Sequence, residues 1–177
     1  GIAAAGGGVV LVLLLVLPLL AAAMSLSPAG IVANGRTVEP TGVALEAWER
    51  LPEGLSVERR KVVTYALALV DRVDYFWGGK SLVLGWDDRW GQLAEVTAEG
   101  DDTSGTERPY GLDCSGFVDW AFYNASGGSY IPGQGGGAAA QHGQCVDNPW
   151  EEVQPGDLVF YPEDDHVGIA AGRDGQG

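Results

Sequence analysis

Cys114 is the residue of this chain whose type and setting best suit a nucleophile. It stands in the segment Leu-Asp-Cys-Ser-Gly-Phe (residues 112–117), at the start of a predicted helix. The positive end of a helix stabilises a thiolate, which is the form of cysteine that attacks a carbonyl carbon. Asp113 is suited to cap this helix, and Gly116 permits close approach of another element. A small buried core residue is an equally good interpretation of the spacing alone.

His166 is the candidate general base. It opens a predicted strand in the segment Asp-His-Val-Gly-Ile (residues 165–169), and a strand end is a rigid place from which to present an imidazole. Cys114 and His166 form a nucleophile–base pair only if the fold brings them within hydrogen-bond reach. A lone surface histidine is the alternative interpretation. His142, the other of the two histidines, has no comparable setting, and we expect it to have no role in the chemistry.

Tyr75 begins the segment Tyr-Phe-Trp-Gly-Gly (residues 75–79), directly after the first predicted helix. The paired glycines allow a tight turn and close backbone approach. A tyrosine hydroxyl in this place can donate a hydrogen bond to a developing oxyanion. A plain aromatic packing cluster is the alternative. The candidates for substrate binding are Trp77 in this segment and Asp113 and Ser115 beside the cysteine.

Cys145 is the second of two cysteines. In an oxidising compartment it could pair with Cys114, which would remove the nucleophile, and we favour two free thiols over that disulfide. The spacing of the two cysteines and two histidines fits no known zinc-finger pattern. We therefore predict no metal site.

The elements that must position these residues can be predicted from the periodicity of the sequence. Residues 56–74 predict a helix, with Ser56 as the N-cap and Glu58 in the first turn. Residues 113–123 predict a second helix, and 157–161 and 167–171 predict two strands joined by a turn at 162–165. A domain that begins with helices and ends with strands is typical of the α+β class. The apolar face of the first helix consists of Val62, Val63, Ala66, Leu67, Leu69, Val70 and Val73.

The N-terminal part of the chain differs from the rest in composition. Residues 2–23 carry no charge, and a run of about 20 apolar residues is long enough to cross a bilayer as a helix. A cleaved secretion signal ending at 21–23 and a buried core helix are the alternatives. We predict a transmembrane anchor or signal segment at 1–24, which places the remainder outside the cytoplasm. Residues 25–54, with three prolines, are predicted to be a linker that contains a short helix at 43–50.

The charge of the chain excludes some classes of function. Acidic residues outnumber basic ones 24 to 10 in 177 residues, for a net charge of −14. This balance argues against nucleic-acid binding, which needs clustered Lys and Arg, and against loose adhesion to anionic lipid. Residues 101–177 are the most acidic part. A solvated acidic face and attraction for a substrate with free amines both explain that excess.

Four segments in this order resemble the NlpC-type cell-wall peptidases, a papain-like cysteine peptidase family. They are Tyr-Phe-Trp-Gly-Gly (75–79), Leu-Asp-Cys-Ser-Gly-Phe-Val (112–118), Gln-Pro-Gly-Asp-Leu-Val-Phe (154–160) and His-Val-Gly-Ile (166–169). Each is weak alone, but the ordered set is specific. The resemblance covers about residues 56–172 and implies a peptidase domain at 55–177, with helices packed on a small antiparallel sheet. Residues 139–144 look like the helical stretch that precedes the third segment in this family.

The resemblance also implies a reaction. It is the hydrolysis of peptide bonds in peptidoglycan stem peptides, usually between D-γ-glutamate and the following diamino acid. Carried over to this sequence, Cys114 is the nucleophile and His166 the base. Tyr75 and the Cys114 backbone amide assist the oxyanion. No cofactor is implied.

Two departures from the family pattern affect these expectations. The family's third catalytic residue, which orients the histidine, lies on a strand after the histidine strand, and the chain ends at Gly177. We can assign no such residue and expect a C-terminally truncated domain with an incomplete sheet. Residues 80–110 form an insertion with Trp86, Trp90 and an acidic run at 99–102. It could shape a groove or act as a lid, or it could be a surface excursion with an aromatic anchor.

The leading hypothesis is therefore an extracytoplasmic, membrane-anchored or secreted cysteine endopeptidase that acts on the bacterial cell wall. A CHAP-type amidase or peptidase is the alternative within the enzyme class. A non-catalytic wall-binding module is the alternative outside it, and a structural membrane protein fits the motifs least. A membrane-tethered wall enzyme would cut locally, which would suit a partnership with secretion or conjugation machinery, although the sequence holds no direct sign of such a machine.

Overall fold

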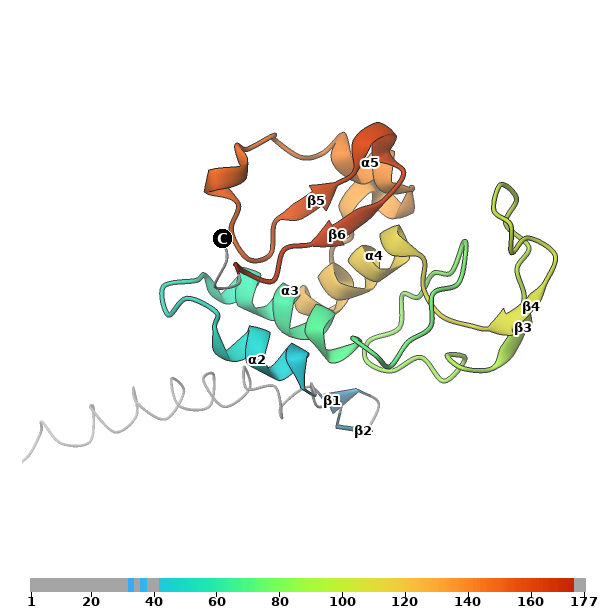
Figure 1. The fold of residues 1–177 in the computed structure, drawn as a ribbon. Coiled ribbons are helices and arrows are strands. Elements are labelled where there is room, and N and C mark those ends of the chain that lie inside the picture. Colours follow the sequence, from blue (N-terminus) through green and yellow to red (C-terminus); the bar gives the residue numbers. More distant parts are fainter. Residues whose placement is uncertain (1–31, 34–35, 38–41, 174–177) are drawn as a thin grey trace, which may run out of the picture.

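Two helices form the centre of the fold in the computed structural model, which describes residues 32–33, 36–37 and 42–173. These helices pack against each other, with one hairpin over the second helix and another hairpin standing well away from both (Figure 1). The central helices are α3 (Val57–Ala68) and α4 (Cys114–Ala125). The covering hairpin is β5 (Leu158–Phe160) with β6 (Val167–Ile169), and the distant one is β3 (Leu93–Glu95) with β4 (Glu107–Pro109).

The remaining elements are short. They are β1 (Val32–Ala33), β2 (Arg36–Thr37), α2 (Val43–Glu49), α5 (Ala138–His142) and the 3₁₀ turns η2 (Pro132–Gly135), η3 (Trp150–Glu152) and η4 (Pro162–Asp164). All strand pairs among the described residues are antiparallel, and they form separate two-stranded ladders. The α+β class is confirmed, but the small sheet is divided into hairpins.

α3 begins where the sequence predicts and ends earlier. The Ser56 side chain caps the helix by accepting a hydrogen bond from the Arg59 backbone N–H at 3.3 Å. The helix ends at Ala68 instead of continuing to residue 74, and Asp71 adopts a left-handed backbone with φ of 60°. Val70 is accordingly exposed, whereas Leu69 and Val73 of the predicted apolar face still pack on the core.

The predicted linker at 25–54 needs a correction in its C-terminal part. Ala44 of α2 and Leu51 after it are buried in one cluster with Val63 and Leu67 of α3. The Trp48 indole N–H donates to the Thr64 hydroxyl at 2.9 Å. Residues 43–51 therefore belong to the folded domain, because they cover a face of α3 that would otherwise be exposed apolar surface.

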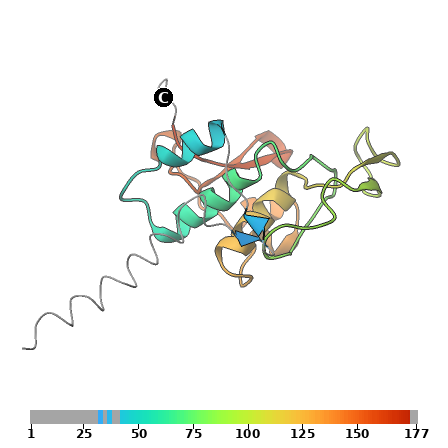
Figure 2. The same ribbon diagram turned by 90° about the horizontal axis from the view of Figure 1, so that it is seen from below.

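The insertion at 80–110 has two parts with different roles. Trp90 packs its ring against Trp120 of α4 at 5.5 Å and against Trp86 at 4.9 Å, so this stretch forms part of the core. The β3–β4 hairpin and the loop at its tip form an arm, which Figure 2 shows clear of the central helices. The insertion is thus anchored by its tryptophans and projects at its tip.

The apolar run at 2–23 lies outside the described residues. Within residues 42–173 and the two short strands before them, the structure has no helix with the length and apolar character needed to span a bilayer.

Candidate active site

Cys114 is the first residue of α4, and Asp113 caps the helix as predicted. One carboxylate oxygen of Asp113 accepts hydrogen bonds from the Gly116 backbone N–H at 2.6 Å and from the Ser115 hydroxyl at 2.9 Å. The cap satisfies a free N–H of the first turn. Cys114 is partly exposed at this end, where the helix dipole favours negative charge on the sulfur.

Tyr75 is held beside this helix start by backbone hydrogen bonds. It forms a parallel bridge with Leu112. The Phe76 N–H donates to the Leu112 carbonyl at 3.1 Å, and the Leu112 N–H donates to the Asp74 carbonyl at 3.1 Å. Because the bridge ends two residues before Cys114, it sets the position of Tyr75 relative to the nucleophile.

The glycines of the two segments make this contact close. A Cβ atom at Gly116 would overlap the carbonyl oxygen of Gly79. A Cβ at Gly79 would overlap the carbonyl oxygen of Gly111, and one at Gly111 would overlap that of Asp74. The same carbonyl of Gly79 accepts from the Asp113 N–H at 3.1 Å. The glycines are therefore needed for the approach of one backbone to the other.

A network of one lysine and two largely buried carboxylates holds the start of α4. Lys80 donates to the Asp113 carboxylate at 3.0 Å and to the Ser115 hydroxyl, and its ammonium lies 4.0 Å from the Asp119 carboxylate. Gln141 of α5 donates to Asp119 at 2.8 Å. Burial raises the pKa of Asp119 to about 6, although Gln141 and Lys80 oppose that rise.

The β5–β6 hairpin is tied to α3 through the Pro-Gly-Asp segment. The Asp157 carboxylate accepts from the Arg59 guanidinium at 2.6 Å and from the Gln154 N–H at 2.8 Å. Gly156 has φ of 89°, and a Cβ atom added there would lie 3.3 Å from the Arg59 side chain. The motif thus sets the starting point of β5, whose Phe160 pairs with Val167 immediately after His166.

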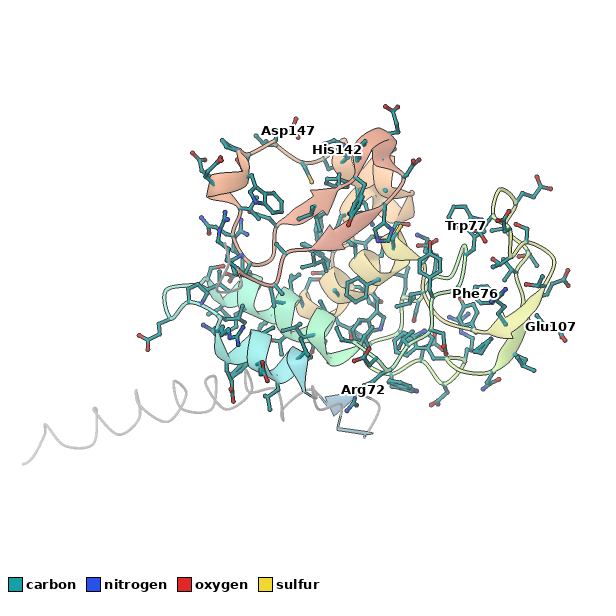
Figure 3. The ribbon with its side chains drawn as sticks, viewed as in Figure 1. Arg72, Phe76, Trp77, Glu107, His142 and Asp147 are labelled. Atoms are coloured by element: carbon teal, nitrogen blue, oxygen red, sulfur yellow. The ribbon has the colours of Figure 1, made fainter. Side chains whose placement is uncertain are left out.

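Tyr75, Cys114 and His166 line one cavity of about 410 Å³. Asp113 lines it as well, with a side chain committed to the helix cap. Two other predicted substrate contacts lie outside its lining. The Ser115 hydroxyl is buried against Lys80 and Asp113, and the Trp77 indole N–H donates to the Glu99 carbonyl at 3.0 Å. Figure 3 shows Trp77 directed to the arm.

The electrostatics of Tyr75 link it to both the nucleophile and the arm. Its pKa is raised, first by partial burial and then by negative charge on Cys114, Asp113 and Asp101. A hydrogen bond from the Cys114 backbone N–H opposes the rise. The Cys114 backbone N–H and the Tyr75 hydroxyl, the two candidate donors to an oxyanion, are therefore neighbours at the start of α4. The charge of Asp101, in the loop at the tip of the arm, thus acts on Tyr75, a coupling that sequence spacing could not reveal.

Residues 72–175, more than half of the chain, match the model of the NlpC/P60 family. This chain belongs to the NlpC/P60 family. The resemblance deduced from the ordered motifs is confirmed.

The NlpC/P60 domain has several mycobacterial relatives. It is 34% identical over 122 residues to "Probable endopeptidase Rv2190c" of Mycobacterium tuberculosis and, equally, to "Probable endopeptidase Mb2213c" of Mycobacterium bovis. These matches cover 68% of this chain and 23% of each relative, so the chain spans about a quarter of their length. Among solved structures, the peptidoglycan hydrolase RipB from Mycobacterium tuberculosis is 24% identical with a TM-score of 0.43, covering 94% of this chain and 75% of that one.

His166 of this NlpC/P60 domain has few contacts at its ring. It is exposed, and the ring of Tyr161 meets it edge-on at 5.4 Å. Within residues 42–173, no side chain hydrogen-bonds the His166 imidazole. The orienting group expected in this family therefore has no counterpart in the described part of the chain.

Both cysteines are free thiols, as we favoured from the sequence. The Cys145 thiol lies 3.4 Å from the carbonyl oxygen of Gln141 in α5 and lines a different cavity from Cys114. Burial and the charges of Asp147 and Asp157 raise the pKa of Cys145, which disfavours its thiolate. Cys114 is thus the cysteine with the setting of a nucleophile.

Proposed function

We propose that this chain is a cysteine endopeptidase that cleaves peptidoglycan stem peptides at the bond between D-γ-glutamate and the diamino acid. The observation that carries the proposal is the convergence of Tyr75, Cys114 and His166 on one cavity within an NlpC/P60 domain. The names of the curated relatives, which are probable endopeptidases, support the endopeptidase activity. The resemblance of the four ordered motifs to cell-wall peptidases supports the substrate class.

Attack on the amide is the first step. Cys114 transfers its proton to His166 and attacks the carbonyl carbon as a thiolate, which the N-terminus of α4 stabilises. The carbonyl oxygen becomes an oxyanion. The Tyr75 hydroxyl and the Cys114 backbone N–H are the donors placed to receive it.

Collapse of this intermediate breaks the carbon–nitrogen bond. The His166 imidazolium returns the proton to the leaving nitrogen, so the diamino acid fragment departs as a neutral amine and a thioester remains on Cys114. A water molecule then gives a proton to His166 and attacks the thioester. The glutamyl carboxylic acid is released and the thiol is restored.

We also propose that this reaction takes place in the cell wall, outside the cytoplasm. The proposed substrate is found there, and an anchor or signal segment at 1–24 would deliver the domain to it. That segment remains a prediction from residues outside the described part.

Mass spectrometry of muropeptides incubated with the chain tests the proposal. The wild type is expected to release fragments split between glutamate and the diamino acid, and Cys114→Ala is expected to release none. Cys145→Ala is the matched control, because it removes the other thiol, which lies outside the cavity, and should retain full activity.

Two other results would point elsewhere. Stem peptides freed whole from the sugar would indicate an amidase of the CHAP type. Retention on insoluble peptidoglycan without any product would indicate a wall-binding module, which the sparse contacts of the His166 ring favour as the second candidate. Full product formation by Cys114→Ala would refute the cysteine mechanism.

A further inference from the structure

His142 has a defined setting, contrary to the expectation from the sequence. It ends α5, and both of its ring nitrogens contact carboxylates. Nδ1 lies 2.6 Å from an Asp164 oxygen, and Nε2 lies 3.2 Å from an Asp147 oxygen. Carboxylates only accept hydrogen bonds, and a neutral imidazole carries a single N–H. Only the imidazolium donates to both partners, so this arrangement favours a charged ring. Figure 3 shows His142 and Asp147 close together at the top of the view.

The His142 ring also rests on the strand that leads to the catalytic hairpin. It stacks on Phe160 with ring centroids 4.3 Å apart and planes 15° apart. Phe160 pairs with Val167 in the hairpin, and the Tyr161 N–H donates to the His166 carbonyl at 3.0 Å. The residue that follows Phe160 is therefore hydrogen-bonded to the backbone of His166.

The turn between these two positions has an unfavourable backbone. Glu163 and Asp164 have φ values of 61° and 57°, in the left-handed region that non-glycine residues seldom adopt. The Asp164 N–H donates to the Tyr161 carbonyl at 3.1 Å. A turn of this kind persists when its surroundings hold it, and the His142 contact to the Asp164 carboxylate supplies such a hold.

His166 follows Asp164 by two residues and lines the cavity with Cys114. No side chain within the described residues hydrogen-bonds its ring, so the backbone of the turn sets where the imidazole lies. We propose that His142 is a positioning residue for His166, acting through its bond to Asp164 and its stacking on Phe160. This inference rests on the proposed function, in which His166 is the base.

The charges around His142 support its protonated form. Hydrogen bonds from His142 to Asp147 and Asp164 raise its pKa. On the elements packed against α5, the titratable groups are Cys114, Asp119 and Tyr123 of α4 with Glu163 and Asp164 of η4. The segment after α5 adds Cys145 and Asp147. At neutral pH the charged members of this set are acidic, so none of them opposes the imidazolium.

The contact between His142 and Asp164 depends on pH in a defined direction. A histidine with a raised pKa stabilises the fold fully below its ordinary pKa and loses that effect as pH rises through the raised value. The contact of His142 with the turn is therefore strongest below the ordinary pKa of histidine. It weakens when the ring of His142 loses its proton.

Nuclear magnetic resonance of the full chain with ¹⁵N-labelled histidine tests this coupling directly. The chain contains only two histidines, so His142→Phe leaves the His166 ring as the sole imidazole signal. In the wild type, the His166 signal is expected to show a second inflection at the midpoint of the His142 titration. In His142→Phe, which keeps an aromatic ring against Phe160, the second inflection should vanish.

Hydrolysis of muropeptides provides the second readout. His142→Phe is expected to lower kcat about tenfold, because a displaced base slows the chemical step, while KM changes less than about twofold. Asp164→Asn should act in the same direction, since asparagine tolerates the left-handed backbone and loses the charge. Glu163→Gln is the matched control, because it removes the same charge from the neighbouring left-handed residue, for which the structure shows no bond to His142.

The outcomes separate this inference from the proposed function. A wild type without cleavage would refute the proposed function, and the His166 titration would still decide whether His142 positions it. Cleavage with an unchanged kcat in both His142→Phe and Asp164→Asn, and a single inflection for His166, would overturn the inference alone. If His142→Phe fails to fold, Asp164→Asn gives the same decision.

Discussion

The two halves of the candidate site are held in different ways. On the nucleophile side, Cys114 and Tyr75 are joined by backbone hydrogen bonds and glycine contacts between residues 74–79 and 111–116. On the base side, His166 stands at the start of a three-residue strand whose hairpin is tied down by side chains, through Arg59 with Asp157 and through His142 with Asp164. The first half is a rigid platform, and the second is an adjustable one.

This difference has a physical consequence. Backbone bonds carry no net charge, so neither salt nor moderate pH affects them. Ion pairs that are partly open to solvent are screened by salt and depend on protonation. The geometry around Cys114 should therefore vary less with salt and pH than the geometry around His166.

The largest loss of stability is expected from Gly116→Ala, on the nucleophile side of the site. The new Cβ would overlap the Gly79 carbonyl, so the start of α4 must move. We expect unfolding stability to fall by about 3 kcal/mol or more, with loss of muropeptide cleavage. Chemical denaturation of Gly116→Ala beside Gly54→Ala, where a Cβ has open space, measures it. Equal stability of the two variants would show that the close approach is not needed.

Lys80→Met should have the next largest effect, because it leaves the buried carboxylates of Asp113 and Asp119 without their cation. We expect a loss of about 2–3 kcal/mol at pH 7, reduced from the value for a fully buried pair because Lys80 is partly exposed. The loss should be smaller at pH 5, where Asp119 is protonated. Urea unfolding at both pH values tests it, with Lys61→Met, the exposed second lysine, as the control.

Arg59→Met tests the adjustable half. It removes the partner of Asp157 and the donor to the Pro155 carbonyl, so the hairpin loses its tie to α3. We expect a loss of about 1–2 kcal/mol at low salt. The difference from wild type should shrink in 1 M salt, where the screening length is about 3 Å. A salt-independent difference would mean that packing of the Arg59 stem, not charge, anchors the hairpin.

Asp119→Asn should change the free energy of unfolding least, and the change should depend on pH. Asp119 has a raised pKa of about 6, so the folded state binds its proton more tightly than the unfolded state does. Between about pH 4 and 6 this group makes unfolding stability fall as pH rises. The stability of Asp119→Asn relative to wild type should therefore rise by roughly 1 kcal/mol from pH 4 to pH 7.

Urea unfolding across that range measures the difference. Asp102→Asn, at an exposed carboxylate, is the control and should show no such trend. A constant difference for Asp119→Asn would indicate that Lys80 keeps Asp119 ionised throughout.

The sequence predicted the local features well, since each depends on residues close together in the chain. Ser56 and Asp113 cap helices through side-chain bonds to N–H groups three residues away. The hairpin at 157–171 follows from two apolar stretches around a turn. The order of the motifs was enough to identify the family.

Other features could not be deduced in this way. The end of α3 at Ala68 and the packing of residues 43–51 on it depend on which apolar surface finds a partner. The insertion at 80–110 was ambiguous because its tryptophans reach the core only through contact with α4. His142 was set aside because neither of its carboxylate partners is marked by the pattern around it.

The sequence by itself determined the types of reactive group, their order and the residues at which α3 and α4 begin. Those properties arise from capping, periodicity and turn chemistry, which act over a few residues. The tertiary structure alone decided that Tyr75, Cys114 and His166 share a cavity, that Lys80 pairs with Asp113 at the start of α4 and that His142 contacts Asp164 in the turn before His166. Contacts between distant segments depend on how helices and hairpins pack, and no local rule specifies that packing.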